Sequence, residues 1–134
     1  MSTKNITRLY VIDDDRHFIY GLNKGLKIRN YCDEILFFDD PKDALEVIEE
    51  NIAKNESIPD FLFLDINMPG IDGWDFLSRL KPIQEKCSKK IKVFIVSSSL
   101  LGSDMEKALA FAEVENYLTK PLSKEMMETI FGTD

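Results

Sequence analysis

The chain has 134 residues, 44% hydrophobic and 31% charged, which suits one globular domain and leaves too little length for two. The net charge of −7 argues against nucleic acid as the main partner, because binding a phosphate backbone requires a positive patch. No apolar run approaches the ~20 residues of a membrane helix. The N-terminus has no hydrophobic signal core, and Cys32 and Cys87 lack metal-ligand spacing, so we expect a cytoplasmic protein with reduced thiols.

Five short apolar runs predict buried strands, because they are continuous and rich in branched and aromatic residues. They cover residues 9–12, 35–38, 61–64, 91–96 and 117–118.

Longer stretches with helical spacing lie between these runs. The first helix is predicted at residues 16–29 and the second at 41–55, with Pro41 in its first turn. A third helix starts near Asp72, and Pro82 is expected to kink or end it. The fourth follows Gly102, and the fifth covers residues 121–131. Side chains predicted to face the core are Phe18, Ile19, Leu22, Leu26, Ile28, Ala44, Leu45, Val47, Ile48, Ile52, Trp74, Phe76, Leu77, Leu80, Met105, Ala108, Leu109 and Phe111.

Alternation of strand and helix five times over predicts a parallel sheet with helices on both faces. Because crossover connections are right-handed, few topologies remain, and the best match is a flavodoxin-like, doubly wound α/β fold of strand order 2-1-3-4-5. Ligands of such sheets bind at the carboxyl ends of the strands where the order reverses. That point lies between the first and third strands, so polar chemistry is expected directly after both.

Polar residues do follow four of the predicted strands, at the same edge of the sheet. They are Asp13, Asp14 and Asp15, then Asp65 and Asn67, then Ser97, Ser98 and Ser99, and finally Thr119 and Lys120. Two carboxylates ~4 Å apart repel by roughly 4 kcal/mol at an effective dielectric constant near 20, so such a cluster requires cations. Lys120 supplies one positive charge, and a hard divalent ion such as Mg²⁺ suits the remaining oxygen ligands.

These residues fit phosphoryl transfer. Asp13 and Asp14 are placed near the metal, with the main-chain carbonyl of Asn67 completing the protein ligands. Asp65 is the candidate nucleophile, because a carboxylate can form an aspartyl phosphate. Lys120 would neutralise charge on the phosphoryl oxygens, and Ser97 would donate a hydrogen bond to one of them.

Each residue group also has an ordinary structural interpretation. Asp13–Asp15 alone fits a solvated turn or a helix cap equally well, and Asp65 before Pro69 and Gly70 fits a turn. The functional hypothesis therefore depends on the joint placement of all members at one edge.

The order of these residues resembles the receiver domain of two-component response regulators, in particular the single-domain chemotaxis type. The matching residues are Asp13, Asp14, Asp65, Asn67, Met68, Pro69, Gly70, Asp72, Gly73, Ser97, Lys120 and Pro121. The resemblance runs from Leu9 to Phe131.

The resemblance implies a role for each matching position. Asp65 is the phosphoacceptor, Asp13 and Asp14 hold Mg²⁺ (for which Mn²⁺ substitutes), and Asn67 binds the metal through its carbonyl. Ser97 and Tyr117 form the conformational switch, and Lys120 precedes a cis proline, Pro121. Asn67 and Ser99 lie where such proteins tune the hydrolysis of the phosphoryl group.

The resemblance also implies partners. A sensor histidine kinase or a histidine phosphotransfer protein would donate the phosphoryl group, since the single histidine, His17, is expected to be an ordinary surface residue. The face made by the fourth helix, the fifth strand and the fifth helix would then bind an unknown protein target. We expect a flexible segment at residues 1–7 and one receiver domain at 8–134, monomeric and without an output domain, which assists only its own phosphorylation and dephosphorylation.

Three other functions fit parts of this pattern. A haloacid-dehalogenase-type phosphatase also uses an aspartate nucleophile and Mg²⁺, but it requires Asp-x-Asp on the first strand. A flavin-binding carrier shares the sheet order, but Asp13, Asp14 and Asp15 would repel the flavin phosphate. The third is a receiver-like module that binds partners without being phosphorylated. All of the site residues are present here, so this module differs from the main hypothesis only in lacking the phosphoryl transfer.

Overall fold

The structure is a computed structural model that describes residues 7–66, 73–98 and 102–131. Its strands are β1 (Arg8–Ile12), β2 (Glu34–Phe38), β3 (Phe61–Leu64), β4 (Lys92–Ser97) and β5 (Val114–Thr119). Its helices are α1 (Arg16–Arg29), α2 (Pro41–Lys54), α3 (Gly73–Gln84), α4 (Gly102–Leu109) and α5 (Lys124–Phe131). None of these helices is both long and apolar enough to cross a membrane.

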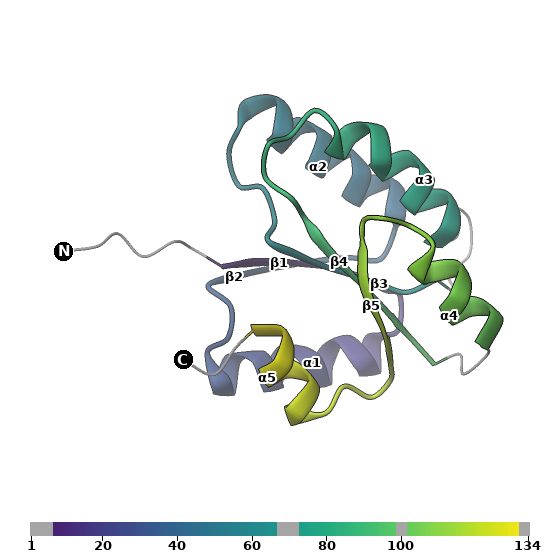
Figure 1. Cartoon of the computed structure of the whole chain (residues 1–134). Helices are drawn as coiled ribbons and strands as arrows, with labels where there is room; N and C mark the ends of the chain where they lie inside the picture. Colours follow the sequence, from purple (N-terminus) through teal and green to yellow (C-terminus); the bar gives the residue numbers. More distant parts are fainter. Residues whose placement is uncertain (1–6, 67–72, 99–101, 132–134) are drawn as a thin grey trace.

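The five strands form one parallel sheet in the order β2-β1-β3-β4-β5, which confirms the predicted topology. Helices α2 and α3 cover one face, and α1 and α5 cover the other, as Figure 1 shows. The short helix α4 lies beside β5 at one end of the sheet. The strand order reverses between β1 and β3, so the carboxyl ends of these two strands mark the predicted ligand position.

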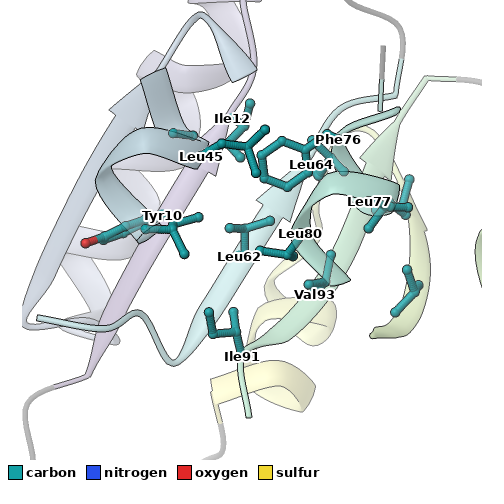
Figure 2. Packing of buried hydrophobic residues seen from close by; sticks show 14 of the residues in the cluster. Tyr10, Ile12, Leu45, Leu62, Leu64, Phe76, Leu77, Leu80, Ile91 and Val93 are labelled. Carbon is teal, nitrogen blue, oxygen red and sulfur yellow. The ribbon is translucent and has the colours of Figure 1, made fainter. Parts of the chain in front are cut away.

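The core has two halves because side chains alternate between the faces of a strand. Tyr10, Ile12, Leu62 and Leu64 point toward α2 and α3, and Figure 2 shows this half. Their neighbours in sequence, such as Leu9, Val11 and Phe63, belong to the other half. A strand buried on both faces must be almost entirely apolar, which explains the continuous runs in the sequence.

The ends of α1 and α2 follow from capping residues. Asp15 and Asp40 accept hydrogen bonds from the first turns, and Pro41 occupies a position where no amide donor is needed. Asn30 and Asn55 end these helices in the left-handed conformation that asparagine tolerates. Both helices therefore match their predicted spans to within one residue.

Helix α3 ends at Gln84, two residues beyond Pro82, the residue expected to kink or end it. Two details of the helix predictions were wrong. Helix α5 begins at Lys124 rather than at residue 121, because the Ser123 hydroxyl accepts a hydrogen bond from the Met126 amide and caps the helix there. Phe111 lies outside α4, which ends at Leu109.

Two side chains predicted to face the core are exposed instead. Ile28 is 77% exposed, because it lies about 200° around α1 from the buried Leu26. Leu109 is 54% exposed at the last position of α4.

Candidate functional site

The hydrogen-bond ladder of the sheet continues one residue past the strands and holds the polar residues in place. The Asp65 amide donates to the carbonyl of Ile12 at 3.0 Å, and the Lys120 amide donates to the carbonyl of Ser97 at 2.9 Å. The amide of Asp13 is bonded to β2 in the same way, at 3.0 Å. The backbones of Asp13, Asp65 and Lys120 are therefore as fixed as the strands that precede them.

Burial singles out this edge of the sheet. Among the described residues, the buried polar or charged side chains are Asp13, Asp65 and Ser97, which are 1%, 6% and 0% exposed. All three follow or end a central strand at the carboxyl edge. Buried carboxylates are costly unless they are paired or bind a cation, so their grouping at one place points to a functional site.

Asp13, Asp14 and Asp65 come together as a carboxylate triad. One oxygen of each lies within 4.8 Å of the other two, while Asp14 is exposed and the other two are buried. Carboxylate oxygens at this spacing are hard ligands that fit Mg²⁺, and the exposed side leaves room for the waters that this ion retains. The donor set therefore fits the divalent ion predicted from the sequence.

Lys120 reaches the triad from the end of β5. Its Nζ atom lies 2.9 Å from Asp13 Oδ2, 3.5 Å from Asp65 Oδ2 and 3.7 Å from Asp15 Oδ2. The lysine side chain is only 13% exposed, so these contacts are poorly screened by solvent. One ammonium group thus balances part of the charge of three carboxylates.

Burial and neighbouring charges shift the pKa values of Asp13 and Lys120. Burial raises the pKa of the Asp13 carboxyl, and the charge of Asp65 adds to the effect. Hydrogen bonds from Lys120 and from the Asp15 amide offset only part of that rise. For Lys120, burial favours the neutral amine, but the hydrogen bond to Asp13 and the charges of the surrounding carboxylates outweigh it and raise its pKa.

Asp15 has a structural role beside the triad. It is the N-cap of α1, where its Oδ1 atom accepts a hydrogen bond from the Phe18 amide at 3.2 Å. This hydrogen bond lowers the pKa of Asp15. The same residue fixes Asp13, because the Asp15 amide donates to Asp13 Oδ1 at 2.8 Å. The ordinary cap interpretation is therefore correct for Asp15, while Asp13 and Asp14 belong to the triad.

The remaining predicted site residues fall into two groups. Ser97 ends β4, the side chain of Tyr117 on β5 is buried in the core, and the peptide bond between Lys120 and Pro121 is cis, as the resemblance implied. Asn67 and Ser99 lie outside the described residues.

One contact of the site was missed from the sequence. The ring of Phe18 lies under the Lys120 ammonium, with 4.5 Å between Nζ and the ring centroid. Helical spacing had assigned Phe18 to the core alone. No sequence signal distinguishes the two roles, because the contact depends on where β5 ends relative to α1.

Comparison with known proteins is consistent with this geometry. The family model for the response regulator receiver domain matches residues 9–131. The probable methanogenesis regulatory protein FilR2 of Methanothrix harundinacea is 27% identical over 117 residues, which cover 87% of this chain and 74% of that protein. Several other curated relatives are transcriptional regulatory proteins and histidine kinases, of which the chain spans between 6% and 45%.

Solved structures agree in fold. A two-component response regulator from Cytophaga hutchinsonii is 29% identical, with a TM-score of 0.77 and 96% of each chain covered. The receiver domain of the histidine kinase CKI1 from Arabidopsis thaliana, complexed with Mg²⁺ and BeF₃⁻, is 22% identical, with a TM-score of 0.80. The matched region covers 92% of this chain and 87% of the CKI1 chain. At this identity the similarity shows a common fold and nothing more.

Proposed function

The chain belongs to the response regulator receiver domain family, and on this premise we propose that Asp65 is the residue that accepts the phosphoryl group. Receiver domains are signalling phosphoacceptors of two-component systems rather than catalytic enzymes. The observation that carries the proposal is the carboxylate triad, in which Asp65 lies beside Asp13, Asp14 and the ammonium of Lys120.

The transfer is a substitution at phosphorus. A carboxylate oxygen of Asp65 forms a bond to phosphorus while the bond from phosphorus to the donor's histidine nitrogen breaks, and that nitrogen keeps the electron pair. The product is an acyl phosphate on Asp65. Lys120, already 3.5 Å from this carboxylate, stabilises negative charge on the phosphoryl oxygens. Ser97, buried at the end of β4, is the proposed hydrogen-bond donor to another of these oxygens.

Mg²⁺ is the proposed cofactor, and Mn²⁺ would substitute for it. Asp13, Asp14 and Asp65 would hold the ion, with the main-chain carbonyl of Asn67 as a further proposed ligand. When bound, the ion neutralises charge that the transferred group brings into a site already rich in carboxylates. Asn67 and Ser99 are proposed to set the lifetime of the acyl phosphate.

The output is proposed to be a population shift between two arrangements of the α4–β5–α5 face. Ser97 would move toward the phosphoryl group, and Tyr117 would occupy the space it leaves. The side chain of Tyr117 is 9% exposed and packs in the core half below α2 and α3. Its burial is compatible with the inward position that this switch requires, and an outward position would characterise the other arrangement.

Receiver domains interact with histidine kinases, and we propose that a sensor histidine kinase or a histidine phosphotransfer protein is the donor here. The target is a protein of unknown identity, and we propose that the chain acts in the cytoplasm as a monomer. Its acidic charge opposes direct binding to nucleic acid.

The test uses a small phosphodonor. Incubation with acetyl phosphate and Mg²⁺ should add one phosphoryl group, as measured by the mass of the intact protein. Removing the ion with EDTA should abolish the adduct, because the triad then repels the incoming group. A protein that remains unmodified under both conditions, and also with phosphorylated histidine donors, would instead favour a binding module that acts without phosphorylation.

A further inference from the structure

Trp74 connects the first turn of α3 to the end of α4. Its ring stacks on that of Phe111, with 6.2 Å between the centroids and 14° between the planes. The ammonium of Lys107, in the last turn of α4, lies 4.7 Å from the centroid of the same ring. We call Trp74, Lys107 and Phe111 the α3–α4 clasp. Stacked rings and cation–π pairs favour a defined geometry beyond simple burial.

The residue before Trp74 is pressed against the segment that carries Asp65. A Cβ atom at Gly73 would lie 2.6 Å from the Cα atom of Ile66, so only glycine permits the observed approach. The Gly73 amide also donates to the Ile66 carbonyl, at 3.4 Å. Ile66 is 3% exposed and directly follows Asp65. Because the backbones of Gly73 and Ile66 are in close contact, a displacement of the Asp65 backbone should also displace the start of α3.

Helix α4 packs beside β5 but buries little of its own surface. Among its described residues only Ala108 is buried, while Met105 is partly buried against the core. Leu109 is 54% exposed, and α4 lies beside the last strand, at the end of the sheet (Figure 1). Because a helix with little buried apolar surface is held weakly, the clasp contributes to the position of α4 in addition to the packing of this helix beside β5.

We propose that Trp74 is a positioning residue that couples the occupancy of the carboxylate triad to the position of α4 through the α3–α4 clasp. This inference rests on the proposed function, because it assumes that the triad binds a cation and a phosphoryl group. The path runs from Asp65 through Ile66 and Gly73 to Trp74, and from there to α4. Coupling between two sites is reciprocal, so loosening the clasp must also change the affinity of the triad.

The sign of the coupling follows from the contacts. In this proposal the clasp restrains the first turn of α3, where Gly73 contacts Ile66, and so limits the motion of Asp65 before any ligand arrives. Without the clasp, the triad must be reordered when a ligand binds, and this lowers its affinity. We expect Phe111→Ala and Lys107→Met to weaken the binding of Mg²⁺ with beryllofluoride, a phosphoryl mimic, by about fivefold or more.

The experiment uses the fluorescence of Trp74, which is the only tryptophan of the chain. Quenching by acrylamide is measured before and after loading with Mg²⁺ and beryllofluoride, and calorimetry gives the affinities. Leu109→Ala is the matched control, because it removes an exposed apolar side chain from the same helix. Lys107→Arg and Phe111→Tyr keep the cation and the ring, so they should restore the affinity that Lys107→Met and Phe111→Ala lose.

In the wild type, loading should change the quenching of Trp74, and in Phe111→Ala that change should disappear although the triad still binds its ligand. A residue that only stabilised the fold would not produce this loss together with rescue by the conservative variants. Unchanged or tighter affinity in Phe111→Ala and Lys107→Met would overturn the coupling while acetyl phosphate still modified the protein. If the protein acquired no phosphoryl group and bound no beryllofluoride, the proposed function and the coupling would fail together.

Discussion

The Nζ atom of Lys120 lies 2.9 Å from Oδ2 of Asp13, so the ends of β5 and β1 are joined by an ion pair across the carboxyl edge of the sheet. The carboxyl side chain is 2% exposed and the lysine side chain 13%. Buried pairs of this kind contribute little net stability, but removing one partner leaves the other charge uncompensated. The site therefore concentrates charge at one place and lowers the stability of the metal-free fold.

Removing the cation should destabilise the protein and slow its phosphorylation. We expect Lys120→Ala to lower the free energy of unfolding by about 2 kcal/mol in metal-free buffer, because Asp13 and Asp65 lose their nearest positive charge. Mg²⁺ should still bind and restore part of the stability. Urea unfolding with and without Mg²⁺ measures both effects, and acetyl phosphate measures the phosphorylation rate.

Lys124→Ala is the control for this prediction. Its side chain is 55% exposed and pairs with Glu128 at 3.9 Å, a contact that solvent screens. It should change neither the stability nor the rate appreciably. A Lys120→Ala protein that was phosphorylated and signalled like the wild type would disprove the role assigned to this lysine.

Neutralising Asp13 should stabilise the metal-free protein while abolishing its response to Mg²⁺. We expect Asp13→Asn to raise the free energy of unfolding by about 1 kcal/mol, because it removes a buried charge whose pKa is raised by burial and by Asp65, while Lys120 keeps Asp65 and Asp15 as partners. Asp14→Asn should lose the Mg²⁺ response with a smaller gain, since Asp14 is exposed. Lower stability of Asp13→Asn without metal would show that the pair with Lys120 outweighs the burial of the charge.

The gain from Asp13→Asn should depend on pH. A carboxyl whose pKa is raised in the folded state contributes stability below its unfolded-state pKa and loses it as pH rises through the folded-state value. Lowering the pH from about 7 to about 4 should therefore shrink the difference in unfolding free energy between Asp13→Asn and the wild type, because a protonated Asp13 resembles asparagine. A difference that grew in acid would mean that the pKa of Asp13 is lowered instead.

Two glycine substitutions should have opposite effects. Gly73→Ala places a methyl group against the backbone of Ile66 and should cost about 2 kcal/mol through overpacking. Gly21→Ala, in the middle of α1, meets nothing within 4 Å and should stabilise the protein by about 0.5–1 kcal/mol through helix propensity. Thermal or urea unfolding distinguishes them, and equal effects would mean that Ile66 can yield to the added methyl.

Much of the fold could be predicted because the strands are buried on both faces. Burial of this kind leaves continuous apolar runs, as at Phe61–Leu64, and it makes a polar residue directly after a strand conspicuous. A polar residue at the end of an apolar strand is found at Asp13, Asp65, Ser97 and Lys120. Parallel topology then brought residues that are far apart in sequence to one edge, and the structure confirms that Asp13, Asp14, Asp65 and Lys120 meet there.

Two of the wrong details do have local signals: Ser123 is a capping residue before α5, and Ile28 lies about 200° around α1 from the buried Leu26. Contacts between elements have no such signal. The stacking of Trp74 on Phe111 depends on how α4 meets α3 in space. Periodicity assigned both rings to helix faces, whereas Phe111 lies past the end of α4, and only tertiary packing brings the two rings together.

The central claim is most directly tested by locating the modified residue. After treatment with acetyl phosphate and Mg²⁺, borohydride reduces an acyl phosphate on aspartate to homoserine, and mass mapping of proteolytic peptides identifies the position. Homoserine should be found at residue 65 in the wild type, and the intact Asp65→Asn variant should gain no phosphoryl group. Homoserine at Asp13 or Asp14 instead, or a phosphoryl group acquired equally by Asp65→Asn, would contradict the account.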